Sequence, residues 1–120
     1  MESRVKFITH KGTRILHLDF TQAHPGEVIQ IIQRAKNVIA AQPPRSIRTL
    51  TDVTDLKFDT KASEAMKEFA NHNKPFVAAA AVVGVTGLKQ IIYNAVVRFT
   101  GRNLVLFESH GQAKDWLVDQ

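Results

Sequence analysis

The sequence predicts one α/β domain built on a mixed five-stranded sheet with about four helices. Strand-type and helix-type patterns alternate along the 120 residues in the order β-β-α-β-α-β-α-β-α. One stretch, Phe76–Val83, is apolar at every position, which is typical of a central strand covered on both faces. An initial hairpin followed by alternating helices and strands favours a sheet whose later strands are parallel. Residues 1–120 contain no linker and no repeat, so we expect a single domain.

The first half of the chain predicts a hairpin and a helix. Val5–His10 and Thr13–Phe20 are rich in β-forming residues, and Lys11-Gly12 supplies the turn between them. Pro25 suits the first turn of a helix, which ends before Pro43-Pro44. The apolar residues of this helix recur at the spacing of one face: Val28, Ile31, Ile32, Ala35 and Ile39.

A third strand and a second helix precede the central strand. Ser46–Val53 is the strand, and Asp59 or Thr60 is expected to cap the helix that follows. The helix stops by Pro75. Its apolar face comprises Ala62, Ala65, Met66 and Phe69.

Glycines delimit the element after the central strand. The turn Gly84–Gly87 leads into a third helix, Leu88–Thr100, and Gly101 stands where a left-handed residue commonly ends a helix. The fifth strand, Asn103–Phe107, precedes a last helix whose start has the capping-box spacing Ser109-x-x-Gln112.

Composition excludes several classes of protein. The chain has no cysteine, which rules out disulfides, thiolate nucleophiles and cysteine metal sites. The N-terminus carries charges where a signal peptide needs an apolar core, and no uncharged run is long enough to span a bilayer, so we expect a cytoplasmic protein. The net charge of +5 is dispersed, without a Lys/Arg run or an aromatic platform, which argues against nucleic-acid binding.

The glycine turn has two interpretations. A turn that feeds a helix presents backbone N–H groups at a positive helix end, so Gly84, Thr86 and Gly87 form a candidate anion site. However, neither the full dinucleotide pattern nor the P-loop pattern is present. We favour the simpler interpretation, in which the glycines permit a tight turn and close packing of the helix.

The third helix has more apolar surface than one packing contact requires. One stripe is expected to face inward: Leu88, Ile91, Ile92, Ala95, Val96 and Phe99. Tyr93 and Val97 lie together on the opposite side, near Lys89, Arg98 and Arg102. This second patch is a candidate surface for a protein partner, a second subunit, an apolar ligand or an anionic membrane, although two apolar residues on an outer face are common in monomers.

Residues for catalysis or metal binding form no recognisable motif. The five histidines lack metal-ligand spacing, although His17 and Asp19 share a strand face that Asp52 or Asp55 could approach. No serine has a nucleophile-elbow context, and the aspartates, Asp59 included, are better explained as caps and turn formers than as acid–base groups. We therefore predict no enzyme activity, no metal and no cofactor.

Two stretches carry a family resemblance. They are Val82–Ser109, VVGVTGLKQIIYNAVVRFTGRNLVLFES, and Ala113–Leu117, AKDWL, with weaker support from Thr51–Asp59, TDVTDLKFD. On these residues the chain resembles the SpoIIAA-like family of STAS-type domains, whose fold is similar to that of the lipid-carrying CRAL-TRIO domains. The resemblance covers nearly the whole chain and implies a STAS-like, non-catalytic bacterial module for binding or regulation.

The resemblance also implies a ligand. For the family members most similar to this chain it implies a small apolar or lipid-like molecule between sheet and helices, with a helix able to move as a gate. By position, the residues implied near such a ligand are Ala65, Met66, Phe69, Ile92, Tyr93, Val96, Val97 and Phe99. The alternative is a protein-interaction or homodimerisation module that uses Tyr93, Val97 and the loop Asp52–Lys61.

The phosphorylation switch of the anti-sigma-factor antagonists is not expected in this chain. The loop after their third strand ends in Asp-Ser-Ser-Gly, whereas this chain has Asp59, Thr60, Lys61 and Ala62. Thr60 could accept a phosphate at a helix N-terminus, where negative charge is favoured. Because Lys61 replaces the switch serine, we predict that the phosphoserine switch is not kept.

Overall fold

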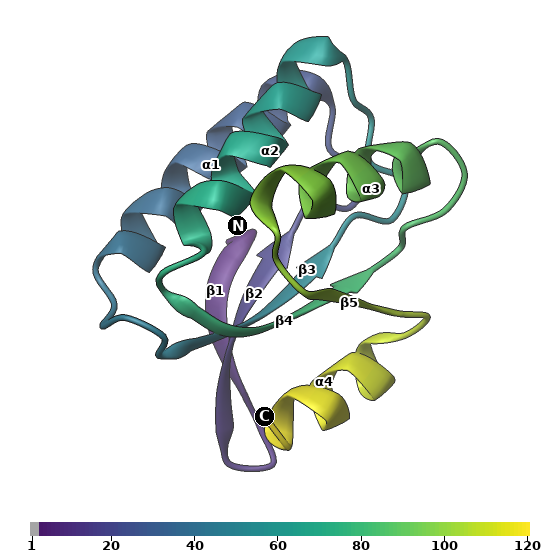
Figure 1. The fold of residues 1–120 in the computed structure, drawn as a ribbon. Coiled ribbons are helices and arrows are strands. Elements are labelled where there is room, and N and C mark those ends of the chain that lie inside the picture. The colour runs from purple at the N-terminus through teal and green to yellow at the C-terminus, as the bar shows by residue number, and fades with distance from the viewer. Residues whose placement is uncertain (1–2) are drawn as a thin grey trace.

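The elements of the chain follow one another in the predicted order β-β-α-β-α-β-α-β-α (Figure 1). The computed structural model describes residues 3–120. The elements are β1 (Val5–His10), β2 (Thr13–Asp19), α1 (Pro25–Ala40), β3 (Ile47–Asp52), α2 (Thr60–Asn73), β4 (Val77–Val83), α3 (Lys89–Thr100), β5 (Leu104–Phe107) and α4 (His110–Val118). The predicted fold class, a mixed five-stranded sheet with four helices, is confirmed.

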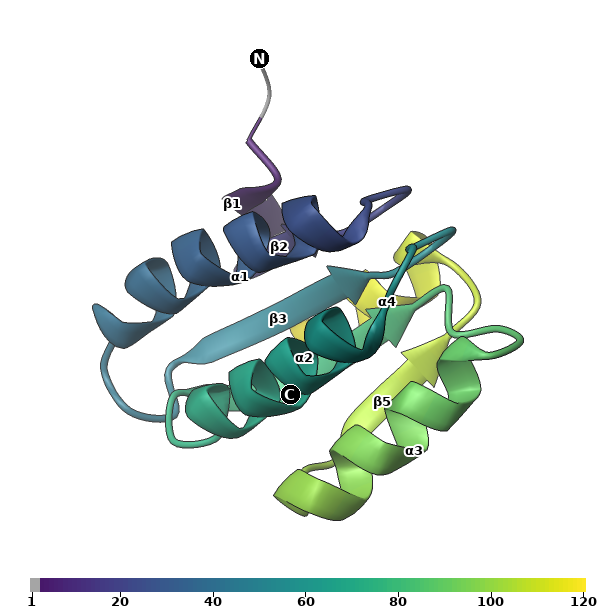
Figure 2. The same ribbon diagram turned by 90° about the horizontal axis from the view of Figure 1, so that it is seen from above.

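The strands lie side by side in the order in which they occur in the chain. β1 is antiparallel to β2, and β2, β3, β4 and β5 are mutually parallel. The helices α1, α2 and α3 cover one face of the sheet, while α4 lies alone on the other face (Figures 1 and 2). Successive right-handed crossovers in one direction place their helices on the same face, which explains this distribution.

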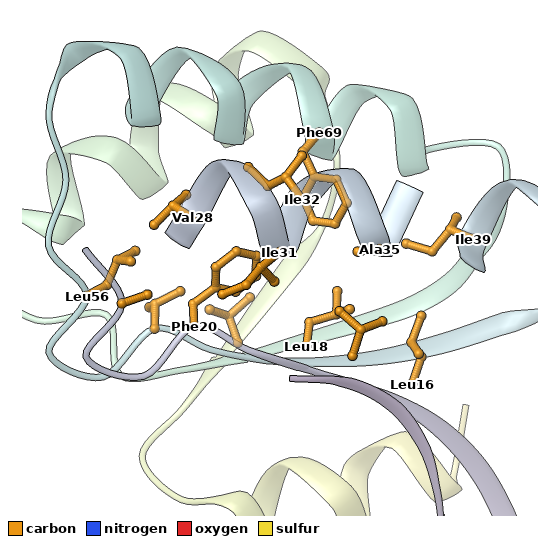
Figure 3. Packing of buried hydrophobic residues seen from close by; sticks show 14 of the residues in the cluster. Leu16, Leu18, Phe20, Val28, Ile31, Ile32, Ala35, Ile39, Leu56 and Phe69 are labelled. Atoms are coloured by element: carbon orange, nitrogen blue, oxygen red, sulfur yellow. The ribbon is translucent and has the colours of Figure 1, made fainter. Parts of the chain in front are cut away.

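The larger core lies between α1, α2 and the sheet. Leu16 and Leu18 of β2 point toward Ile31 and Ile39 of α1, and Phe69 of α2 packs from above (Figure 3). Burial of these aliphatic and aromatic side chains supplies most of the driving force for this packing, at about 1.5–3 kcal/mol for each fully buried side chain.

A smaller core lies under α4. Because side chains alternate along a strand, Ile15 of β2 and Leu50 of β3 face α4, where they meet Ala113 and Leu117. β4 contributes to both cores, which confirms that it is covered on both faces from Ala80 to Val83, although Ala78 near its start is exposed. Within residues 3–120, no helix combines the length and the apolar character needed to cross a membrane.

The helix caps explain where the helices begin and end. His24 and Glu27 form a reciprocal capping box at α1. Asp59, rather than Thr60, caps α2 by accepting a hydrogen bond from the Ala62 N–H. Gly101 ends α3 in the left-handed conformation with φ of 67°, as predicted.

Candidate functional site

A cavity of about 100 Å³ lies between α2, α3 and the sheet. The residues of the sheet that form its floor are Leu18 of β2, Thr49 and Thr51 of β3, Ala80 and Val82 of β4, and Leu104 of β5. The walls are Ala62, Met66, Phe69 and Ala70 from α2 and Ile92, Tyr93 and Val96 from α3. The interior on this side of the sheet is therefore not completely filled by side chains.

The cavity exists because the residues beneath it are small. A buried parallel strand is usually rich in valine, isoleucine and leucine, but β4 carries alanine from Ala78 to Ala81, and of these four residues Ala80 lies on the floor of the cavity. Above Ala80, the helix α2 presents two more alanines, Ala62 and Ala70. The alanine run was the signal in the sequence, since alanine is depleted in strands.

The orientation of α3 differs from the prediction. Leu88, Ile91 and Phe99, expected to face inward, are 70%, 66% and 58% exposed, and Ala95 is exposed as well. Tyr93 and Val97, expected on the outer face, are half-buried. The assignment was therefore wrong for these residues, whereas Ile92 and Val96 face inward as predicted.

Hydrogen bonds to the sheet explain the orientation of α3. The Tyr93 hydroxyl donates to the Leu104 carbonyl oxygen at 2.5 Å, and the Lys89 Nζ donates to the Val53 carbonyl oxygen at 3.0 Å. Periodicity shows which residues share a side of a helix, but not which side turns inward. Tyrosine and lysine can bury their apolar parts while their polar ends reach a hydrogen-bond acceptor. The side of α3 that carries Tyr93 and Lys89 therefore faces the sheet.

Only some of the predicted ligand residues line the cavity. Those that do are Met66, Phe69, Lys89, Ile92, Tyr93 and Val96, whereas Ala65, Val97, Arg98 and Phe99 do not. Arg102, predicted near the Tyr93 and Val97 patch but not among the ligand residues, also lines the cavity, just beyond α3. Its guanidinium donates to the Ala70 carbonyl oxygen at 3.0 Å, and burial lowers its pKa. An arginine remains protonated at neutral pH despite such a shift.

Comparison with known proteins agrees with this architecture. No family model and no curated protein matches the chain. A solved structure does: an uncharacterised protein of the DUF3478 family with a SpoIIAA-like fold, from Shewanella loihica PV-4, has a TM-score of 0.73 over 98% of each chain, at 18% sequence identity.

The chain has a SpoIIAA-like fold. At 18% identity the similarity concerns the fold alone, and the further similarity to CRAL-TRIO domains stays a prediction. The lining residues place the cavity under the pair α2 and α3. This is the face of the sheet that carries three helices (Figure 2).

The glycine turn is built for close packing. Gly84 has φ of +92°, and a Cβ atom at this position would lie 2.4 Å from the Thr54 Oγ1 and 2.6 Å from the Thr54 nitrogen. The first amides of α3 are already engaged, since Lys89, Gln90 and Ile91 donate to carbonyl oxygens within the turn. Both observations favour the structural interpretation of Gly84, Thr86 and Gly87 over an anion site.

Thr60 lies at the first position of α2, where it is exposed. The Asp59 carboxylate already occupies the cap beside it. A phosphate on Thr60 would be repelled by that negative charge. The helix N-terminus would therefore stabilise the phosphate less than it would at an uncharged cap.

A polar cluster lies on the opposite face of the sheet. Asp19 and Asp52 are register partners at the ends of β2 and β3. Each is followed two residues later by a threonine, Thr21 or Thr54. In both cases the aspartate Oδ1 accepts hydrogen bonds from the threonine N–H at 2.9 Å and from the threonine hydroxyl at 2.6 Å. The repeated Asp-x-Thr spacing is the signal in the sequence from which both turns could have been predicted. These aspartates therefore serve as turn formers, as predicted for Asp52.

Histidines complete this polar cluster. The His110 Nε2 lies 2.5 Å from the Asp52 Oδ2, which joins the start of α4 to β3. The His17 ring meets the His110 ring edge-on at 5.4 Å between centroids, and the His17 Nε2 is buried without a hydrogen-bond partner among residues 3–120. No group of three or more His, Asp or Glu side chains in the described part of the chain could hold a metal ion.

The shifted pKa values of His17 and Asp52 make the folded state more stable at neutral pH than at acidic pH. Burial lowers the pKa of His17; the Asp19 and Asp52 carboxylates oppose this shift, and His110 and Lys6 add to it. Burial raises the pKa of Asp52, but hydrogen bonds from Thr54 and His110 outweigh it and leave that pKa below its usual value. Both groups bind protons more readily in the unfolded chain than in the folded protein.

We predict that His17 makes the protein less stable as the pH falls below about 6.5, the usual histidine pKa in an unfolded chain. Asp52 adds a further loss only below about pH 4. Urea unfolding of the wild type and His17→Phe between pH 7.5 and 5 checks this. The stability of the variant relative to the wild type should rise steadily as the pH falls, and a constant difference would show that His17 does not titrate in this way.

Proposed function

We propose that this protein is a non-catalytic module that binds a small apolar molecule in the cavity between α2, α3 and the sheet. The observation that carries the proposal is the cavity itself, which is lined by alanine, valine and aromatic side chains where a sheet of this kind is normally filled. An empty apolar cavity costs stability, by about 24 cal/mol for each Å³, and a ligand that fills it recovers part of that cost.

The size of the cavity limits the ligand. Its volume of about 100 Å³ is smaller than the ~150 Å³ engineered cavity that binds benzene in another protein. A molecule with a short chain or a single ring is therefore the size that fits without movement. A longer lipid-like chain requires α3 to move away from α2.

Native mass spectrometry of the protein purified at neutral pH, followed by solvent extraction, tests this function. We expect a bound small molecule that leaves on mild activation, with the extract containing an apolar compound. The proposal fails if neither a retained molecule nor saturable binding of an added apolar compound such as 1-hexanol is found.

The helix α3 is the element suited to act as a gate. It buries only Val96 and Thr100, whereas α1 buries five residues and lies in the middle of the larger core. Elements with few buried contacts open at lower free energy than core elements. Opening of α3 would uncover the cavity without disturbing α1.

We predict that the backbone amides of α3 exchange with solvent faster than those of α1, and that a bound apolar ligand slows exchange in α3 selectively. Hydrogen exchange followed by mass spectrometry or NMR gives both comparisons, with α1 as the internal reference. Equal protection of α1 and α3 in the free protein would contradict a gating role.

Homodimerisation is the alternative function. The exposed apolar surface that would support it differs from the predicted one, which included Tyr93. Tyr93 is largely occupied by its contact with Leu104, but Leu88, Ile91 and Phe99 form an exposed apolar side of α3. Sedimentation velocity over a range of concentrations tests this alternative. A dimer that Ile91→Glu dissociates would favour it, whereas a monomer at all concentrations would exclude it.

A further inference from the structure

The cavity has a distinctive charge. Two of the residues that line it are cationic, Lys89 and Arg102, and none of its described lining residues is an aspartate or a glutamate. An apolar cavity with positive ends and no negative group favours a ligand that carries negative charge.

Arg102 is the more informative of the two cations. Its guanidinium donates to the Ala70 carbonyl oxygen, and among residues 3–120 it has no other side-chain hydrogen bond and no carboxylate within ion-pair distance. Arg4 provides a contrast, because it lies near both Asp19 and Glu27. Arg102 is half-buried, and even partial burial of a guanidinium without a counter-ion costs free energy that an anion beside it recovers in part.

The backbone at Arg102 is held in place. Its N–H donates to the Thr100 Oγ1 at 3.1 Å, and the Thr100 hydroxyl in turn donates to the Val96 carbonyl oxygen at 2.8 Å. The side chain therefore leaves a fixed point at the end of α3. A guanidinium has five N–H donors in a planar fork, so donors remain for a carboxylate after the bond to Ala70.

Lys89 lies at the other end of α3. A helix of 12 residues separates their backbones by about 17 Å along its axis, and their charged groups bind different segments, Val53 and Ala70. Lys89 is already bound to the Val53 carbonyl oxygen and presents a point charge rather than a fork. Arg102 is therefore the better anchor for a carboxylate.

We infer that the cavity takes a small apolar monocarboxylic acid, with its carboxylate on the Arg102 guanidinium and its hydrocarbon part toward Ala80 and Val96. This inference rests on the proposed function, because it names the class of ligand for the same cavity. The bond from Arg102 to Ala70 also stabilises the C-terminus of α2, so the test must respond to the charge of the ligand and not only to stability.

The test compares hexanoate with 1-hexanol, which differ in charge but have the same chain length. Calorimetric or fluorescence-displacement titrations at pH 7.5 use the wild type, Arg102→Gln and the matched control Arg98→Gln, at an exposed arginine of α3 that does not line the cavity. We expect the wild type to bind hexanoate at least tenfold tighter than 1-hexanol. Arg102→Gln should weaken hexanoate binding about tenfold or more and change 1-hexanol binding less than twofold, while Arg98→Gln should keep the wild-type preference.

The outcomes separate the inference from the proposed function. Equal binding of both compounds by the wild type would agree with an apolar binding cavity but overturn the inference that its ligand carries a carboxylate. Equal weakening of both compounds by Arg102→Gln, or an equal loss of the preference in Arg98→Gln, would overturn the role of Arg102. Binding of neither compound would overturn the proposed function itself. If Arg102→Gln does not fold, the wild-type preference and its decrease with added salt still decide whether the ligand binds as an anion.

Discussion

Replacing Ala80 by leucine is expected to abolish the binding of small apolar ligands. Ala80 forms part of the floor of the cavity and is buried beneath α2 and α3. A leucine side chain there would occupy the space that a ligand needs. We expect affinity for 1-hexanol to fall about 100-fold, which corresponds to about 2.7 kcal/mol.

The matched control for this prediction is Ala78→Leu. Ala78 lies on the same strand, and it is exposed and does not line the cavity. The two variants carry the same chemical change, so only Ala80→Leu should lose binding. Circular dichroism should show both variants folded, because inserting a side chain into an existing cavity avoids much of the usual cost of about 1–3 kcal/mol for overpacking. Undiminished binding by Ala80→Leu would place the ligand elsewhere.

Replacing Gly84 by alanine is expected to have the largest effect on stability. Its left-handed φ is unfavourable for alanine, and the added Cβ would meet the Thr54 backbone, which cannot rotate away as a side-chain end can. We expect the free energy of unfolding to fall by about 2–4 kcal/mol, measured by urea titration.

Gly87→Ala separates the two causes of that loss. Gly87 also has a left-handed φ, 58°, but an added Cβ there would meet no atom within 4 Å. It should therefore cost only about 1 kcal/mol, from the backbone conformation alone. Similar losses at both positions would mean that the packing of Gly84 against Thr54 contributes little.

The fold could be predicted because its signals are local. The hairpin turn at Lys11-Gly12, the helix stop at Gly101 and the fully apolar β4 each specify one structural state. The order of elements then limits the topology, because parallel strands joined by short connections need right-handed crossovers. Strand ends were predicted less well, since Ser46 and Asn103 lie just outside β3 and β5.

The site could be predicted only in part, because it depends on how a helix is rotated and on what faces it. Tyr93 was identified as unusual, but its bond to Leu104 depends on β5 lying beneath α3. Arg102 becomes informative only when its surroundings are known to lack a carboxylate. His110 and Asp52 are 58 residues apart in the sequence, and no local pattern joins them.

Intermolecular NOEs from bound 1-hexanol to assigned methyl groups test the central claim most directly. If the ligand lies between α2, α3 and the sheet, its protons should show NOEs to the methyl groups of Val82, Ile92 and Val96, which line the cavity. NOEs confined to Leu88 and Ile91, on the exposed side of α3, would instead show surface adsorption and contradict the account.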